Sequence, residues 1–129
     1  MNNLTAETIK NSGMSLTCAR GTTLFVEVEI YDADGNAYNV PVNGKVIFSV
    51  KKNKSDNTPL IMEEMTSKTQ GVAGSGFYLQ LYGDDTDYPA GRYWYDIVVS
   101  EGNAWTLQAV PPSILLITET MCNVGAIWT

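Results

Sequence analysis

The sequence predicts an all-β protein that folds as an antiparallel β-sandwich of about seven to nine short strands. Apolar and polar residues alternate along many short runs, and turn-forming residues recur about every 8–12 residues. No segment of useful length shows the apolar periodicity of an amphipathic helix. With 129 residues, the chain is expected to form a single domain.

The first strands are expected in residues 14–20 and 22–31, separated by Gly21. One face of the second strand carries Leu24, Val26, Val28 and Ile30. The other face carries Phe25, Glu27, Glu29 and Tyr31. This period of two predicts one buried and one solvated face. Residues 32–36, with the sequence Asp-Ala-Asp-Gly-Asn, are typical of a tight turn.

The middle of the chain continues the pattern. Residues 45–51 are expected to form a strand with Val46, Phe48 and Val50 on one face. A further strand is expected at 59–66, with Leu60 and Met62 facing away from Ile61. After the glycine-rich turn at 69–76, apolar and polar positions alternate again: Phe77, Leu79 and Leu81 against Tyr78, Gln80 and Tyr82.

A β-hairpin is predicted next, from the alternating run at 91–99, the turn at 101–103 and the run at 105–108. The last strong strand is expected separately, at 114–118, after Pro111 and Pro112. A single helical turn is expected at 84–88, capped by Asp84 or Asp85.

The domain organisation follows from these elements. Residues 1–13 are polar and aperiodic and are expected to form a flexible or partner-ordered arm, with the sandwich spanning 14–120. Residues 121–129 form an uncharged apolar tail whose candidate interaction residues are Val124, Ile127 and Trp128. Two interpretations of this tail stay open: docking on its own sheet, or docking on another subunit in a homo-oligomer.

Charge and composition exclude several partners. A net charge of -6 disfavours binding to nucleic acid, and the basic cluster at 51–54 is interpreted as a solvated strand end. The first residues lack a signal peptide, and no uninterrupted apolar run reaches membrane-spanning length, so no membrane partner is expected. Synthesis in a cytoplasm predicts that Cys18 and Cys122 are free and buried, although the sequence leaves their pairing open.

The sequence shows none of the residue arrangements that we associate with catalysis. The chain has no histidine, which argues against a hydrolytic triad and a zinc site, and Glu63 and Glu64 should point to opposite faces of a strand. We therefore predict no catalytic residues and no cofactor. Weak calcium candidates are the oxygen-bearing residues of two turns: Asp32, Asp34 and Asn36, and Asp84, Asp85 and Asp87.

Aromatic residues offer a different kind of site. Tyr93 and Tyr95 should share one face of their strand, and Trp94 the other. Core packing is the simplest interpretation for one set. Exposed aromatic side chains such as Trp94 can also bind sugars or proteins, which leaves a carbohydrate-binding or adhesin-like module as the alternative function.

Three blocks of the sequence resemble one family. Residues 20–26, Arg-Gly-Thr-Thr-Leu-Phe-Val, precede Tyr-Asp-Ala-Asp-Gly-Asn at 31–36, and residues 44–52 read Gly-Lys-Val-Ile-Phe-Ser-Val-Lys-Lys. The third block joins Leu-Gln-Leu-Tyr-Gly-Asp-Asp-Thr at 79–86 to Gly-Arg-Tyr-Trp-Tyr-Asp-Ile at 91–97, with the spacing Pro-x-Gly-x-Tyr-x-Tyr beginning at Pro89. In order and spacing they resemble the immunoglobulin-like domains of tailed-phage and prophage structural proteins, such as the N-terminal domain of phage baseplate upper proteins.

The resemblance implies an immunoglobulin-like sandwich that acts as a non-catalytic virion structural protein, attached to a tail or baseplate through protein–protein contacts. It implies assembly in the host bacterial cytoplasm, followed by presence in the virion, and it carries over no catalytic residues. Baseplate upper proteins usually continue into a long helical or fibre region, whereas this sequence ends after the apolar tail. A stand-alone adaptor or accessory protein is therefore expected.

Overall fold

The computed structural model describes residues 15–102 and 104–120, and within them the backbone forms eight strands and no helix. The strands are β1 (Leu16–Ala19), β2 (Leu24–Glu29), β3 (Lys45–Lys51), β4 (Ile61–Glu64), β5 (Thr66–Ser67), β6 (Gly76–Leu81), β7 (Gly91–Glu101) and β8 (Ala104–Thr118). This confirms the predicted all-β class. The described part of the chain holds no helix long and apolar enough to cross a membrane.

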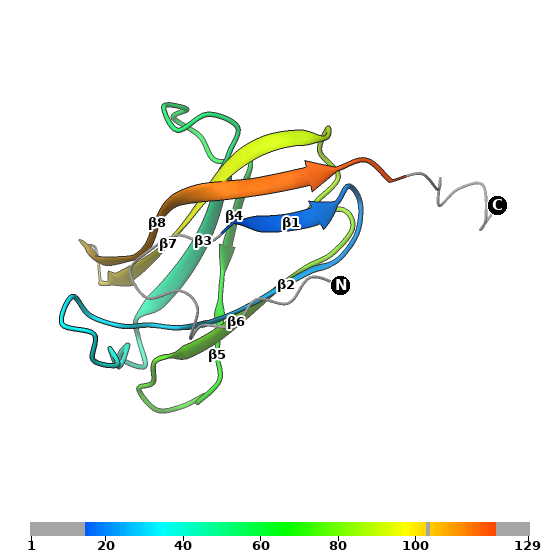
Figure 1. Cartoon of the computed structure of the whole chain (residues 1–129). Coiled ribbons are helices and arrows are strands. Elements are labelled where there is room, and N and C mark those ends of the chain that lie inside the picture. Colours follow the sequence, from blue (N-terminus) through cyan, green and yellow to red (C-terminus); the bar gives the residue numbers. More distant parts are fainter. Residues whose placement is uncertain (1–14, 103, 121–129) are drawn as a thin grey trace.

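The strands form two sheets, which lie as two layers in Figure 1. One sheet has five strands in the order β1-β8-β7-β3-β4, and the other has three in the order β2-β6-β5. The chain passes from one sheet to the other between β4 and β5 at Met65, which is buried and whose N–H donates to the Val46 carbonyl.

One pairing departs from the antiparallel expectation, because β1 and β8 run parallel, with Leu16 beside Leu115. Parallel neighbours cannot be joined by a tight hairpin and need a long connection. β1 and β8 satisfy this requirement because every other strand lies between them in the sequence.

The core lies between the two sheets and follows the predicted alternation. Leu24, Val26 and Val28 of β2 are buried, as are Phe77, Leu79 and Leu81 of β6. They pack in one cluster with the inward residues of the other sheet, among them Val46, Phe48 and Val50 of β3 and Tyr93, Tyr95, Ile97 and Val99 of β7. The prediction that Tyr93 and Tyr95 share a face, opposite Trp94, is confirmed.

Strand β8 differs from the prediction, because one strand from Ala104 to Thr118 replaces the two expected runs. Tyr95 pairs with Ser113 and Ile97 with Val110, so Asp96 lies opposite both Pro111 and Pro112. This is a β-bulge, in which two residues oppose one and the ladder is locally interrupted. Because a bulge tolerates prolines that lack an N–H, the strand continues where the sequence suggested an end.

Two predicted turns can be compared with the structure. At residues 32–36, the Asp32 N–H donates to the Asn36 carbonyl at 2.8 Å, and Gly35 has a φ of 85°, as a tight turn requires. The helical turn predicted at 84–88 instead forms as one hydrogen-bonded turn from Tyr82 to Thr86. There the Asp85 carboxylate reaches back to accept from the Tyr82 N–H at 2.9 Å.

The core predicts a large cost for one truncation. Phe48 has no exposed surface and stacks on Tyr95, with 5.5 Å between the ring centroids. We expect Phe48→Ala to lower the free energy of unfolding by about 3–5 kcal/mol, measured by urea denaturation. Val42→Ala, at a side chain that is 65% exposed, is the control and should change it by less than about 0.5 kcal/mol. Equal effects of the two changes would contradict this placement of the core.

Candidate binding groove on the five-stranded sheet

The outward face of the five-stranded sheet is built by the residues that alternate with the core. The register places Lys51 of β3 beside Trp94 of β7, and Trp94 beside Ile114 of β8. The next outward position pairs Ser49 with Asp96. The position after that pairs Ile47 with Val98, and Val98 with Gln108. Polar and apolar side chains are therefore mixed on this face.

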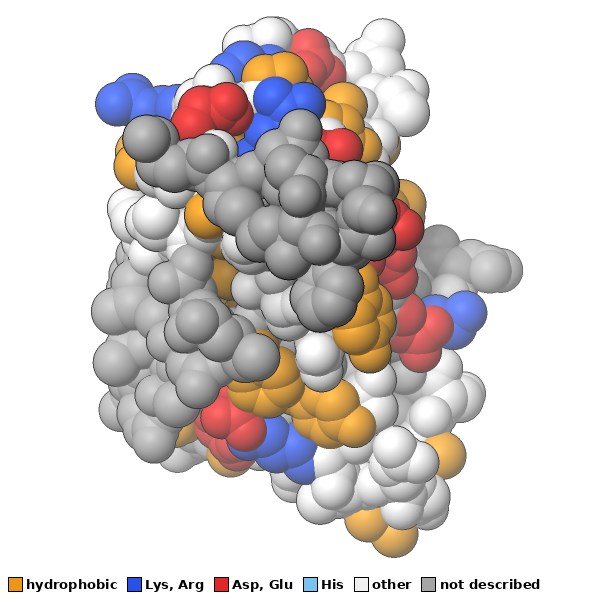
Figure 2. Space-filling model, turned by 90° about the vertical axis from the view of Figure 1, so that its right-hand side faces the viewer, with side chains coloured by type: hydrophobic (Ala, Val, Ile, Leu, Met, Phe, Trp, Pro, Cys, Tyr) orange, Lys and Arg blue, Asp and Glu red, His pale blue; other side chains and the backbone are white. Residues whose placement is uncertain are grey.

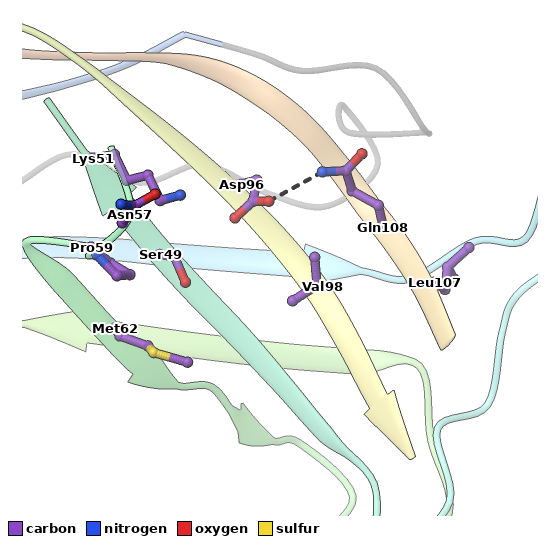
Figure 3. A pocket seen from close by; sticks show the side chains of 9 residues that line it. All are labelled: Ser49, Lys51, Asn57, Pro59, Met62, Asp96, Val98, Leu107 and Gln108. Atoms are coloured by element: carbon purple, nitrogen blue, oxygen red, sulfur yellow. Dashed lines mark hydrogen bonds between the residues drawn. The ribbon is translucent and has the colours of Figure 1, made fainter. Parts of the chain in front are cut away.

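A groove of about 690 Å³ crosses this face. Its lining comes from four strands of the sheet, β3, β4, β7 and β8, and from the loop before β4: Ser49, Lys51, Asn57, Pro59, Met62, Asp96, Val98, Leu107 and Gln108 (Figure 3). The volume lies within the usual range of ligand-binding clefts, which combine apolar walls with a few polar groups. We define these nine residues as the sheet groove.

Asp96 is the central ionisable group of the sheet groove. Its carboxylate accepts a hydrogen bond of 3.1 Å from the side-chain amide of Gln108, on the neighbouring strand (Figure 3). Burial raises the pKa of Asp96, whereas the Gln108 hydrogen bond and the charge of Lys51 oppose the rise. A partly desolvated carboxylate in a groove is a common property of binding sites.

The β-bulge explains how these two groups meet. Pro111 and Pro112 are accommodated opposite Asp96, and a second register shift follows between Ile97 and Val98. Bulges often re-aim side chains beside functional sites. Here the shifts leave Ala109 and Val110 both buried, and they bring Gln108 onto the outward face next to Val98.

Trp94 borders the sheet groove through two smaller hollows. One, of about 80 Å³, is lined by Trp94, Lys54 and Pro112 and shares Ser49, Lys51 and Asp96 with the sheet groove. Another, of about 330 Å³, lies between Trp94, the two prolines and Ile114. The Trp94 side chain is half-buried, and the Lys54 ammonium lies 4.0 Å from its ring centroid. Such an exposed cation–π contact contributes only about 0.5–1 kcal/mol.

The other predicted site residues are distributed as follows. Val124, Ile127, Trp128 and Cys122 lie outside the described residues. Cys18 is buried in β1 as a free thiol, and burial raises its pKa. The basic cluster at 51–54, predicted as a solvated strand end, also contacts β7. The Lys52 ammonium donates a hydrogen bond to the Arg92 carbonyl at 3.0 Å.

The turn carboxylates that were weak calcium candidates mainly hold their own turns. One oxygen of Asp32 accepts from the N–H groups of both Asp34 and Asn36. Asp87 forms an ion pair of 2.9 Å with Arg20. Among residues 15–102 and 104–120, no group of three or more His, Cys, Asp or Glu residues is placed to hold a metal ion.

Sequence reasoning singled out Trp94 but missed the sheet groove. It did not name Asp96 among the candidate site residues, and the hydrogen-bond partner of this carboxylate is Gln108 on a neighbouring strand. The available signal was a carboxylate between Tyr95 and Ile97 in an otherwise apolar strand, followed by two consecutive prolines in its hairpin partner.

The chain was also compared with known proteins. A scan against models of protein families and a search of curated proteins find no match to this chain.

The raised pKa of Asp96 predicts how pH changes stability. The carboxyl has an ordinary pKa of 3.8, so the unfolded chain releases the proton first as the pH rises. The raised pKa of Asp96 in the folded chain therefore contributes stability that is fully present below pH 3.8. This stability is lost as the pH rises through the folded pKa. We expect the free energy of unfolding of Asp96→Asn, relative to the parent, to increase from about pH 3 to pH 7.

Urea denaturation at both pH values measures this difference. Asp84→Asn, at an exposed position in a turn, controls for the loss of one negative charge from the acidic protein. A relative stability of Asp96→Asn that falls as the pH rises would contradict the assignment.

Proposed function

We propose that this chain is an immunoglobulin-like, non-catalytic structural module of a tailed-phage or prophage virion, acting through protein–protein assembly. Three lines support the proposal: the order of the strands, a hydrogen bond at the start of β7, and the place of that bond within the sequence block that resembles the phage domains.

The strand order fits an immunoglobulin-like sandwich. In that fold the C, F and G strands form one sheet, the B, E and D strands lie in the other, and variable-type domains add a C′ strand beside C. On this proposal β3, β7 and β8 correspond to C, F and G, with β4 as C′, and β2, β6 and β5 correspond to B, E and D.

A hydrogen bond at the start of β7 resembles the tyrosine corner of immunoglobulin-like domains, and we use that name for it. The Tyr93 hydroxyl donates to the Pro89 carbonyl at 2.6 Å, four residues upstream. Immunoglobulin-like domains have such a tyrosine near the start of strand F, two residues before a cysteine in antibodies. Here Tyr95 occupies the position that the cysteine has in antibodies. Where the antibody cysteine forms a disulfide to the other sheet, the Tyr95 ring stacks on Phe48 of β3.

The tyrosine corner is the observation that carries the proposal. Pro89, Gly91, Tyr93 and Tyr95 are the fixed positions of the Pro-x-Gly-x-Tyr-x-Tyr block that resembles the phage domains. The Tyr93–Pro89 hydrogen bond gives that spacing a physical reason, because the tyrosine must reach back over the turn. The resemblance, together with the uncharged tail at 121–129, points to assembly as the activity.

Exposed apolar surface is consistent with assembly. Leu60, Met62 and Leu116 are 41%, 57% and 40% exposed, although each is a large hydrophobic residue. Figure 2 shows the side of the molecule toward which β8 runs, where hydrophobic side chains form separate patches between charged ones. Patches of this kind suit contacts that mix apolar and polar groups.

The tyrosine corner predicts a measurable contribution to stability. We expect Tyr93→Phe to lower the free energy of unfolding by about 0.5–1.5 kcal/mol, because it removes one hydrogen bond and keeps the ring. Tyr82→Phe, at a side chain that is 62% exposed, is the matched control and should leave the free energy unchanged. A Tyr93→Phe variant as stable as the parent in urea denaturation would remove this support.

Assembly is tested first by solution mass. We expect light scattering to show a defined oligomer for the full chain and a monomer for a chain ending at Thr120. A monomer in both cases would exclude the tail as a self-association surface. The virion role is tested separately, by mass spectrometry of purified particles from a host that carries the gene. Absence of the chain from intact particles would contradict that role.

A further inference from the structure

We propose that the sheet groove is a binding site for a neutral, elongated saccharide. This inference goes beyond the assembly role, since a saccharide site would act whether or not the chain is part of a virion. Four features support it: the adjoining hollows, the paired strands beneath their centre, the near-neutral set of polar groups in the sheet groove, and the apolar walls.

The three hollows on the outward face adjoin one another, and we refer to them together as the depression. The sheet groove and the 80 Å³ hollow share Ser49, Lys51 and Asp96. That hollow and the 330 Å³ hollow share Trp94 and Pro112. The depression therefore runs across β3, β7 and β8 past Trp94. Its form suits a chain of several linked units better than a single compact molecule.

The centre of the depression lies on strands whose backbone is already paired. β3 and β7 have hydrogen-bonded neighbours on both sides, whereas β8 pairs with β1 only along Leu115–Thr118. Strand addition needs an exposed sheet edge, whereas this site lies on a sheet face. Recognition must therefore come from side chains, which favours a ligand rich in its own hydrogen-bonding groups.

The polar side chains of the sheet groove both donate and accept. Asp96 accepts, Lys51 donates, and Ser49, Asn57 and Gln108 can do either. In Figure 3 the Lys51 and Asp96 side chains point into the same space, and the charge of Lys51 acts on Asp96. One cation beside one anion leaves the sheet groove close to neutral, and Lys54 adds one positive charge at the Trp94 end of the depression. A sugar hydroxyl, which donates and accepts while uncharged, matches this set.

The apolar walls complete the match. Met62, which is 57% exposed, lies in Figure 3 across the sheet groove from Val98 and Leu107. Trp94 offers an aromatic ring at the other end of the depression, beneath the exposed Lys54 side chain. The C–H faces of pyranose rings are apolar and pack on such surfaces. Because the Lys54 contact is weak, a ligand can displace that side chain from the Trp94 ring.

The test is a titration of the full chain, labelled with ¹⁵N, followed by NMR. The probes are three neutral hexasaccharides: cellohexaose, chitohexaose and maltohexaose, each up to about 10 mM so that a millimolar complex is detected. We expect at least one probe to shift the Trp94 indole N–H and the Gln108 side-chain amide. We expect Asp96→Ala and Trp94→Ala each to weaken that binding at least about tenfold.

Matched variants separate binding from folding. Tyr82→Ala removes an exposed aromatic ring that does not line the depression, and it should bind as the parent does. Met62→Ala, at an exposed side chain of the wall, gives a second weakened variant if Trp94→Ala disturbs the fold. Preserved dispersion of the backbone spectrum shows that each variant is folded.

Three results would overturn the inference. They are no shift at the sheet groove with any hexasaccharide, equal binding by Asp96→Ala, and tighter binding of either comparison probe. The comparison probes are hexagalacturonate, for an anionic saccharide, and an uncharged Gly-Ser-Thr decapeptide, for an extended peptide. None of these results bears on the light-scattering or particle measurements, so failure of the saccharide site and failure of the assembly role are distinguishable.

Discussion

The rest of the structure depends on the two-sided strand β7. It lies between β3 and β8, and its residues alternate between the core and the outward face. Tyr93, Tyr95, Ile97 and Val99 are buried, whereas Trp94, Asp96 and Val98 line the outer depression. A slip of one residue would exchange the two sets and place Asp96 in the core. The packing that fixes the fold therefore also fixes the candidate site.

The irregularity of β8 is the second constraint, and it connects fold to site. An ideal ladder would keep β7 and β8 in one register, but their pairing contains three register shifts. The first accommodates the two prolines, and the second places buried Val110 and Ala109 in succession. Prolines at a bulge cannot complete the ladder, so backbone pairing alone does not explain this stretch of β8. The register that results places Gln108 on the outward face, where it donates a hydrogen bond to Asp96 on the neighbouring strand.

The sequence predicted the elements whose burial is one-sided. The alternation in β2, β3 and β6 correctly placed Val26, Phe48 and Leu79 in the core, because period two reports directly which face is buried. It did not predict the parallel pairing of β1 with β8, which depends on contacts between the two ends of the described chain. It also separated β8 at the prolines, since the bulge that tolerates them is a property of the pair of strands.

Trp94 was the one candidate of the site that sequence reasoning found, because an aromatic residue alternating with buried tyrosines is visible in one strand. Gln108 was not visible in this way. Twelve positions separate Gln108 from Asp96, and their contact depends on how many residues the bulges insert. Hydrogen-bond partners across an irregular hairpin follow from the register, which the pattern of one strand alone does not determine.

The outward faces of the two sheets differ in how their large side chains contact one another. On the three-stranded sheet, Phe25 stacks on Tyr78, and Lys68 pairs with Glu27 at 2.8 Å, so the large side chains are engaged with each other. Such cross-strand pairs stabilise a sheet and leave few groups directed outward. On the five-stranded sheet, a partly desolvated carboxylate lines a groove beside an exposed Met62. Stability alone would favour covering or replacing these groups. The presence of these groups on one face, while large side chains on the other face contact each other, supports the proposed saccharide site on the five-stranded sheet.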